Sequence, residues 1–196
     1  AGAFNVNITG QLDVVSGITN NSTNAQAFSG PVVLRFSGSP TINAASGNLS
    51  FSSLGYNSTN DTVTFTGAHA ITIGNGVNMG TGANGKQFVK TGTGTLFFNG
   101  SAGGTVDPAT TGLNINQGTV VANNNNALNF TTNVRLGNTS GSASASLILG
   151  SGISSNRSVL VRSGNSGTMT LGSSSDSTTT LSGLVTAQKN ITIAQQ

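Results

Sequence analysis

Apolar and polar residues alternate in short segments along the whole chain, as in "VVLRF" (32–36), "TVTFT" (62–66) and "SVLVR" (158–162). Alternation of this kind predicts β-strands with one buried face, and the many valines, isoleucines and threonines favour the same conformation. Glycine or asparagine interrupts every stretch in which apolar residues could follow a helical period. The pattern therefore predicts an all-β protein without helices.

The apolar segments recur at intervals of about 18 to about 27 residues, which is within the range of solenoid repeats. Their centres are Val14, Val33, Phe51, Ile71, Leu96, Val120, Leu147, Met169 and Ile191. A second set falls between them in the second half of the chain, at Leu113, Val134, Val159 and Leu184. Two or three short strands per period describe one rung of a parallel β-helix. We therefore expect a single β-solenoid domain over residues 1–196, with about nine rungs.

The same period predicts which side chains stack inside the coil. Successive rungs of a β-helix lie about 4.8 Å apart, so each inward residue contacts an apolar residue above and below it. The expected core stack is Val33, Phe51, Ile71, Leu96, Val120, Leu147, Met169 and Ile191. A β-sandwich, which also consists of short strands with frequent turns, is the alternative fold.

The composition favours a stacked fold over a disordered chain. Charged residues make up only 6% of the sequence, and glutamate is absent. Like charges at the spacing of stacked rungs would repel each other, so a low charge suits such a fold. Disordered chains combine high net charge with few β-branched residues. This chain instead has 35% hydrophobic residues and a formal net charge of +3.

A Gly-Thr pair opens an apolar strand in "KTGTGTLFFNG" (90–100), "GTVVANN" (118–124) and "GTMTLGS" (167–173). On these motifs, residues 86–193 resemble the autotransporter-associated β-strand repeat of bacterial surface and secreted proteins. The matching positions are Lys90, Gly92, Gly94, Thr95, Leu96 and Phe98 in the first half, and Gly112, Ile115, Gly118, Thr119 and Val120 in the second. The segment "SAGGTVDPAT" (101–110) departs from the aromatic-bearing turn of that family. The resemblance implies a right-handed β-helix that is exported to the bacterial surface.

Few residues offer catalytic or metal-binding chemistry, so we expect no enzyme, no cofactor and no metal site. Glycan cleavage needs clustered carboxylates, but the four acids lie in different parts of the sequence: Asp13, Asp61, Asp107 and Asp176. The single histidine, His69, has no cysteine or nearby acid with which to build a metal site or a triad. The lysines and arginines are scattered and form no basic stripe for nucleic acid. No stretch approaches the roughly 18 apolar residues of a membrane helix, so no membrane insertion is expected.

These features predict a non-enzymatic structural protein, exported as a mature chain to the cell surface or the extracellular space. Both ends of the chain have the pattern of an open strand edge, which can pair with another copy. The residues expected at such a head-to-tail contact, in a fibre or sheath, are Phe4, Val6, Ile8, Leu184, Ile191 and Ile193. The alternative for these ends is that longer flanking sequence caps them in the native protein. The alternative is an adhesive, passenger-like segment that binds host-surface or matrix glycans. The asparagine run at 123–126 could offer amide groups to a glycan, although an asparagine-rich turn is the simpler interpretation.

Overall fold

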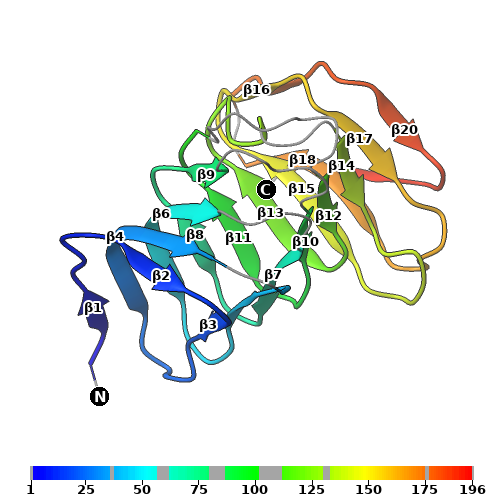
Figure 1. The fold of residues 1–196 in the computed structure, drawn as a ribbon. Helices are drawn as coiled ribbons and strands as arrows, with labels where there is room; N and C mark the ends of the chain where they lie inside the picture. Colours follow the sequence, from blue (N-terminus) through cyan, green and yellow to red (C-terminus); the bar gives the residue numbers. More distant parts are fainter. Residues whose placement is uncertain are drawn as a thin grey trace.

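The computed structural model describes residues 2–35, 38–56, 62–79, 87–101, 112–129, 133–174 and 177–195. Every regular element within these ranges is a β-strand, and none of the described residues belongs to a helix that could cross a membrane. The strands pair in parallel and stack as a β-solenoid, from β1 at one end to β20 near the other (Figure 1). The prediction of an all-β solenoid is confirmed.

Two long stacks of strands form the main sides of the coil. Wall 1 consists, in stacking order, of β1 (Phe4–Val6), β4 (Gln26–Leu34), β6 (Leu49–Tyr56), β8 (Ile71–Ile73), β11 (Thr95–Phe98), β13 (Gly118–Ala122), β15 (Ala145–Leu149), β18 (Met169–Ser173) and β21 (Thr192–Gln195). Wall 2 consists of β3 (Gly17–Thr19), β5 (Thr41–Ala44), β7 (Thr62–Gly67), β10 (Gln87–Lys90), β12 (Gly112–Ile115), β14 (Asn133–Leu136), β17 (Ser158–Val161) and β20 (Val185–Ala187).

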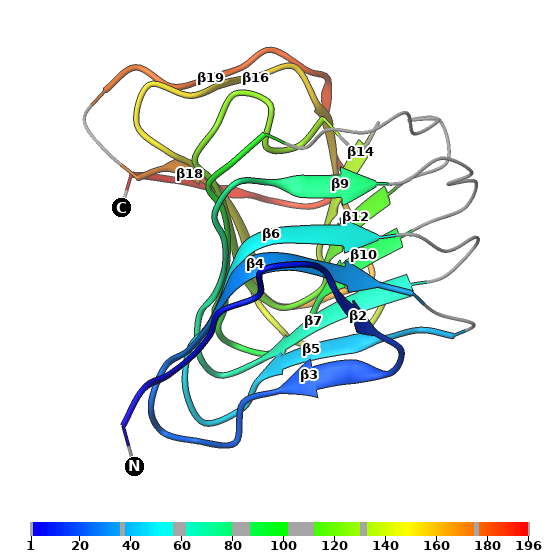
Figure 2. The ribbon, with the colours of Figure 1, turned by 60° about the vertical axis from the view of Figure 1, so that its left-hand side comes forward.

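A third, shorter side closes the coil between the two walls. In the N-terminal half it contains β2 (Leu12–Val14) and β9 (Val77–Met79), which pair with the second halves of β4 and β6. Near the other end, β16 (Ser154–Ser155) pairs with β19 (Thr180–Leu181). The chain leaves wall 1 within β4, where the register shifts between Phe28 and Pro31. Figure 2 shows β2, β6 and β9 on one side of the coil and β3, β5 and β7 on the other.

The coil has about seven turns, because seven windings separate the eight strands of wall 2. The expected count of about nine rungs is not confirmed. That count gives each of nine apolar segments a full rung, from Val14 on the third side to Ile191 just before β21. Among the described residues wall 1 has nine stacked strands and wall 2 has eight, so not every strand belongs to a complete turn.

Four residues of the expected core stack lie in one column of wall 1. Ile71 pairs with Leu96, Leu96 with Val120 and Val120 with Leu147, and all four are buried. Phe51 is buried in the adjacent inward column, because it pairs with Ile73.

The other three members of the expected stack are placed differently. Met169 is buried, but it pairs with Ala145 at the start of the strand and so belongs to a third column. Val33 is only half-buried, whereas its neighbours Val32 and Leu34 are fully buried and point inward. Ile191 precedes β21 and packs against the core while partly exposed. In an apolar doublet such as Val32-Val33, sequence alternation alone does not decide which residue faces inward.

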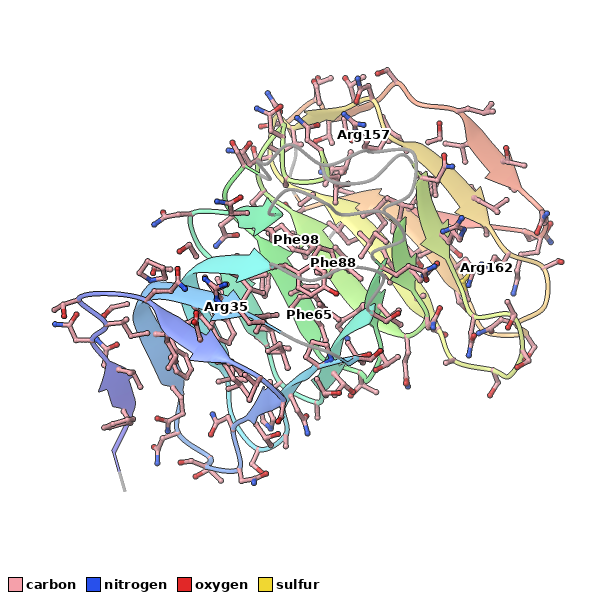
Figure 3. All side chains as sticks on the ribbon, viewed as in Figure 1. Arg35, Phe65, Phe88, Phe98, Arg157 and Arg162 are labelled. Atoms are coloured by element: carbon pink, nitrogen blue, oxygen red, sulfur yellow. The ribbon has the colours of Figure 1, made fainter. Side chains whose placement is uncertain are left out.

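Aromatic side chains fill the interior of the N-terminal half. The rings of Phe65 and Phe88 lie 5.6 Å apart, and those of Phe28 and Phe51 stack at 5.1 Å. Phe65, Phe88 and Phe98 lie together inside the coil (Figure 3). Aromatic rings therefore fill this part of the core, and each ring buries more area than an aliphatic side chain of the later turns.

Candidate functional site

Among the described residues, the two side chains of the kinds used most often in acid-base catalysis, Asp13 and His69, lie on different turns of the coil. Within the described ranges no three residues of the types His, Cys, Asp and Glu form a group that could hold a metal ion. Asp13 lies on the surface of the first turn, where its carboxylate pairs with Arg35 Nε at 2.9 Å. A hydrogen bond from Gln11 lowers the pKa of Asp13, and the pairing with Arg35 adds to this effect. His69 is exposed at the corner after β7. The remaining acids lie outside the described residues: Asp61, Asp107 and Asp176.

One lysine is fully buried, at the corner where the chain passes from wall 2 to wall 1. Lys90 ends β10 and is only 1% exposed. Its Nζ donates hydrogen bonds to the backbone oxygens of Thr91 at 2.6 Å, Gly92 at 2.8 Å and Gln117 at 3.3 Å. An ammonium group has three hydrogens to donate, so these carbonyls can satisfy all of them. Because Gln117 belongs to the next turn, Lys90 joins two successive turns of the coil.

Two glycines shape this corner, and one of them, Gly118, leaves the space for the ammonium group. Gly92 and Gly118 have φ angles of +70° and +77°, which side-chain-bearing residues rarely adopt. A Cβ atom at Gly118 would lie 2.8 Å from Lys90 Nζ and 2.4 Å from the oxygen of Gly92. The packing of this corner therefore explains two sequence motifs: the Lys-x-Gly spacing at 90–92 and the Gly-Thr pair at 118–119 in the next turn.

Buried polar groups occupy the same corner in other turns. Lys189 Nζ donates to the backbone oxygens of Asn165 and Gly167, both at 2.6 Å. Asn165 is itself buried, and its amide nitrogen donates to the oxygen of Ala143. In the first turns Asn20 has the same role, with its amide bonded to the oxygens of Asn24 and Asn48. These contacts hold adjacent turns in register, so we interpret the lysine corners as structural.

The buried lysine makes stability depend on pH in a defined direction. Burial lowers the pKa of Lys90 from 10.5 to about 8. Above pH 8 the folded chain therefore releases a proton that the unfolded chain keeps until about pH 10.5, so the free energy of unfolding rises with pH across this window. We expect a rise of no more than about 3 kcal/mol, which Lys90→Met should remove. Urea unfolding followed by circular dichroism at pH 7.5, 9 and 10.5 measures the free energy of unfolding of the wild type and of Lys90→Met. If this free energy changes with pH equally in both proteins, Lys90 is not the group that titrates.

The interior of the coil is accessible from solvent at the last turn. A cavity of about 660 Å³ lies there between wall 1, wall 2 and the third side, and apolar residues from all three line it: Leu147, Leu149, Leu171, Leu181, Val185, Ile191 and Ile193. Ile193 is 73% exposed, although it continues the inward column through its pairing with Leu171. Leu184, 71% exposed, lies just before β20 on the same turn.

The first turn exposes apolar side chains at the opposite end. Phe4 on β1 is 64% exposed, while Val6 is half-buried. Ile8 is half-buried and packs against the core. Its backbone lies so close to Gly30 that a Cβ atom added to Gly30 would collide with Ile8. The structure thus places the six residues of the expected contact on two separate ends of the coil.

The sequence interpretation missed a pair of arginines on the outer face of wall 2. Arg135 lies on β14 and Arg162 directly follows β17, which pairs with β14. The coil brings the two arginines onto neighbouring turns because their separation of 27 residues is close to one period. In the sequence both belong to the scattered charges. Their spacing by one period is the only sequence signal that connects them.

Comparisons of the chain with known protein families, with curated proteins and with solved structures find no match. The resemblance of residues 86–193 to the autotransporter-associated repeat therefore remains a prediction.

Proposed function

We propose that this chain is a non-enzymatic structural subunit of an extracellular bacterial fibre or sheath, in which copies of the β-solenoid assemble head to tail. The end that carries Leu184, Ile191 and Ile193 would meet the end that carries Phe4, Val6 and Ile8 of the next copy. A contact between two different surfaces of the same chain propagates instead of closing, so it gives a filament. The proposal includes right-handed winding, because connections between parallel strands are right-handed in about 98% of cases.

The observation that carries the proposal is an unbroken column of paired residues from one end to the other. Phe4 pairs with Gln26 at the start of wall 1, and the same column ends at Ile193. The intermediate members are Leu49, Ile71, Leu96, Val120, Leu147 and Leu171. Both ends of the coil therefore present equivalent positions of one parallel sheet. Free strand edges of this kind bind further strands through their unpaired N–H and C=O groups.

The test is whether the purified chain forms filaments, and whether a single end residue controls them. We expect electron microscopy to show filaments of the wild type, and Ile193→Asp to shorten them to single coils because it places a carboxylate in the joint. Thr192→Asp, on the opposite face of the same strand, is the matched control and should reduce assembly much less. A monodisperse monomer of the wild type in sedimentation at high concentration would overturn the proposal.

A further inference from the structure

Arg135 lies in a long outward row on wall 2. Strand pairing aligns this row across seven strands, as Thr41, Thr64, Val89, Asn114, Arg135, Leu160 and Thr186. The inward neighbours of Arg135, Val134 and Leu136, are fully buried, which places the arginine on the outer face. The row thus places Asn114 and Leu160 next to Arg135, with threonines on the more distant strands.

Arg162 is fixed beside this row by hydrogen bonds. Its Nη2 donates to Asn114 Oδ1 at 2.9 Å and its Nη1 donates to the oxygen of Gly137 at 3.3 Å. Asn114 is only 6% exposed, and its amide nitrogen donates to Gln87 Oε1 at 2.9 Å. The guanidinium of Arg162 is therefore held in place by a chain of buried polar contacts. Figure 3 shows Arg162 on the outside of wall 2, well away from the core phenylalanines.

Arg135 has no such partner. It donates no hydrogen bond and forms no ion pair within the part of the chain that the structure describes, although it is half-buried. Its guanidinium lies against Gly112, where Nη1 would be 2.7 Å from an added Cβ. The absence of a side chain at Gly112 leaves room for Arg135 to lie flat on the wall.

The two arginines repel each other. Burial lowers the pKa of Arg162, and the positive charge of Arg135 lowers it further. Among the described residues the one acid, Asp13, pairs with Arg35 in the first turn and does not reach them. Within the described residues these two neighbouring cations have no counter-charge, so an anion bound between them would relieve their repulsion.

We propose that Arg135 and Arg162, the latter positioned by the buried Asn114, bind the oxyanion of an acidic polysaccharide that lies along the outer face of wall 2. Guanidinium groups bind carboxylate and sulfate through two parallel hydrogen bonds. The threonine hydroxyls of the outward row, on Thr41, Thr64 and Thr186, offer hydrogen bonds to sugar hydroxyls. This site lies on the side of the coil and is independent of head-to-tail assembly, so it goes beyond the proposed structural role.

The test is binding of polygalacturonate and dextran sulfate, which carry carboxylates and sulfates, with neutral dextran and inorganic sulfate for comparison. We expect Arg135→Gln and Arg162→Gln each to weaken binding of at least one acidic polymer by about tenfold or more. Arg35→Gln removes the same charge at a distant place and should change the affinity less than about twofold. Calorimetry in low and in physiological salt gives these affinities.

The melting temperature separates a binding role from a structural one. Because Arg135 makes no hydrogen bond, Arg135→Gln should melt at or above the temperature of the wild type while binding is lost. Equal binding by wild type and Arg135→Gln would overturn the proposal. So would an equal loss in Arg35→Gln, which would indicate attraction by net charge alone, or binding of inorganic sulfate without either acidic polymer.

Discussion

Replacing Val120 with Asp is expected to prevent folding of the coil or to destabilise it severely. Val120 is fully buried in β13, between Leu96 and Leu147 in the inward column of wall 1. A carboxylate at this position would lose its hydration between two apolar side chains. An uncompensated buried charge costs about 3 to 5 kcal/mol, a large part of the stability of an ordinary domain.

Thr119→Asp is the matched control, because it introduces the same group one position earlier in the same strand. Thr119 alternates with Val120 and therefore faces outward, between Thr95 and Ser146. Thermal unfolding followed by circular dichroism should show a native-like transition for Thr119→Asp and a lost or strongly lowered one for Val120→Asp. If both variants melt like the wild type, the inward column is wrong.

The strands and most of the core could be predicted because both depend on local alternation. Ile71, Leu96, Val120 and Leu147 share a column even though the segments between them differ in length. The outer loops absorb these differences, and the walls keep the register.

The errors in the predicted core follow from the period of a strand. An error of two residues keeps a side chain on the same face, so Met169 is buried although the column of Leu147 continues at Leu171. An error of one residue reverses the face, so Val33 is half-exposed while Val32 points inward. Apolar doublets are therefore the places where sequence interpretation of such a coil fails.

The polar sites were harder to predict because their partners come from different turns. Lys90 could have been found from alternation alone, since Phe88 and Lys90 occupy inward positions of β10. The bond from Lys90 to Gln117, and the approach of Arg162 to Asn114, depend on which turns are neighbours. Which residues lie beside each other on neighbouring turns depends on the exact register of the strands. The sequence does not reveal this register, because the segments between the strands differ in length.

If copies assemble head to tail as proposed, the numbers of strands in the two walls constrain the joint between them. Among the described residues wall 1 has nine stacked strands and wall 2 has eight, so β21 extends one level beyond β20. β1 and β3 are the first strands of wall 1 and wall 2. If β3 of the next copy pairs with β20, its β1 would lie at the level that β21 already occupies. We therefore expect β21 to displace β1 and to pair with β4 of the next copy. The alternative, direct pairing of β21 with β1, would leave wall 2 one strand short at every joint.

Cysteine pairs can distinguish the two joints, since the chain has no cysteine of its own. When β21 takes the place of β1, Ala194 takes the position of Asn5, which pairs with Ala27. Neighbouring strands of a sheet are about 4.8 Å apart, within the Cα separation that a disulfide accepts. Filaments of Ala27→Cys/Ala194→Cys are thus expected to give ladders of covalent oligomers on non-reducing gels after oxidation. The matched pair Asn5→Cys/Ala194→Cys should give few covalent oligomers. Cross-linking through Asn5→Cys/Ala194→Cys but not through Ala27→Cys/Ala194→Cys would establish direct pairing of β21 with β1. Filaments that neither cysteine pair cross-links would place the joint elsewhere on the coil.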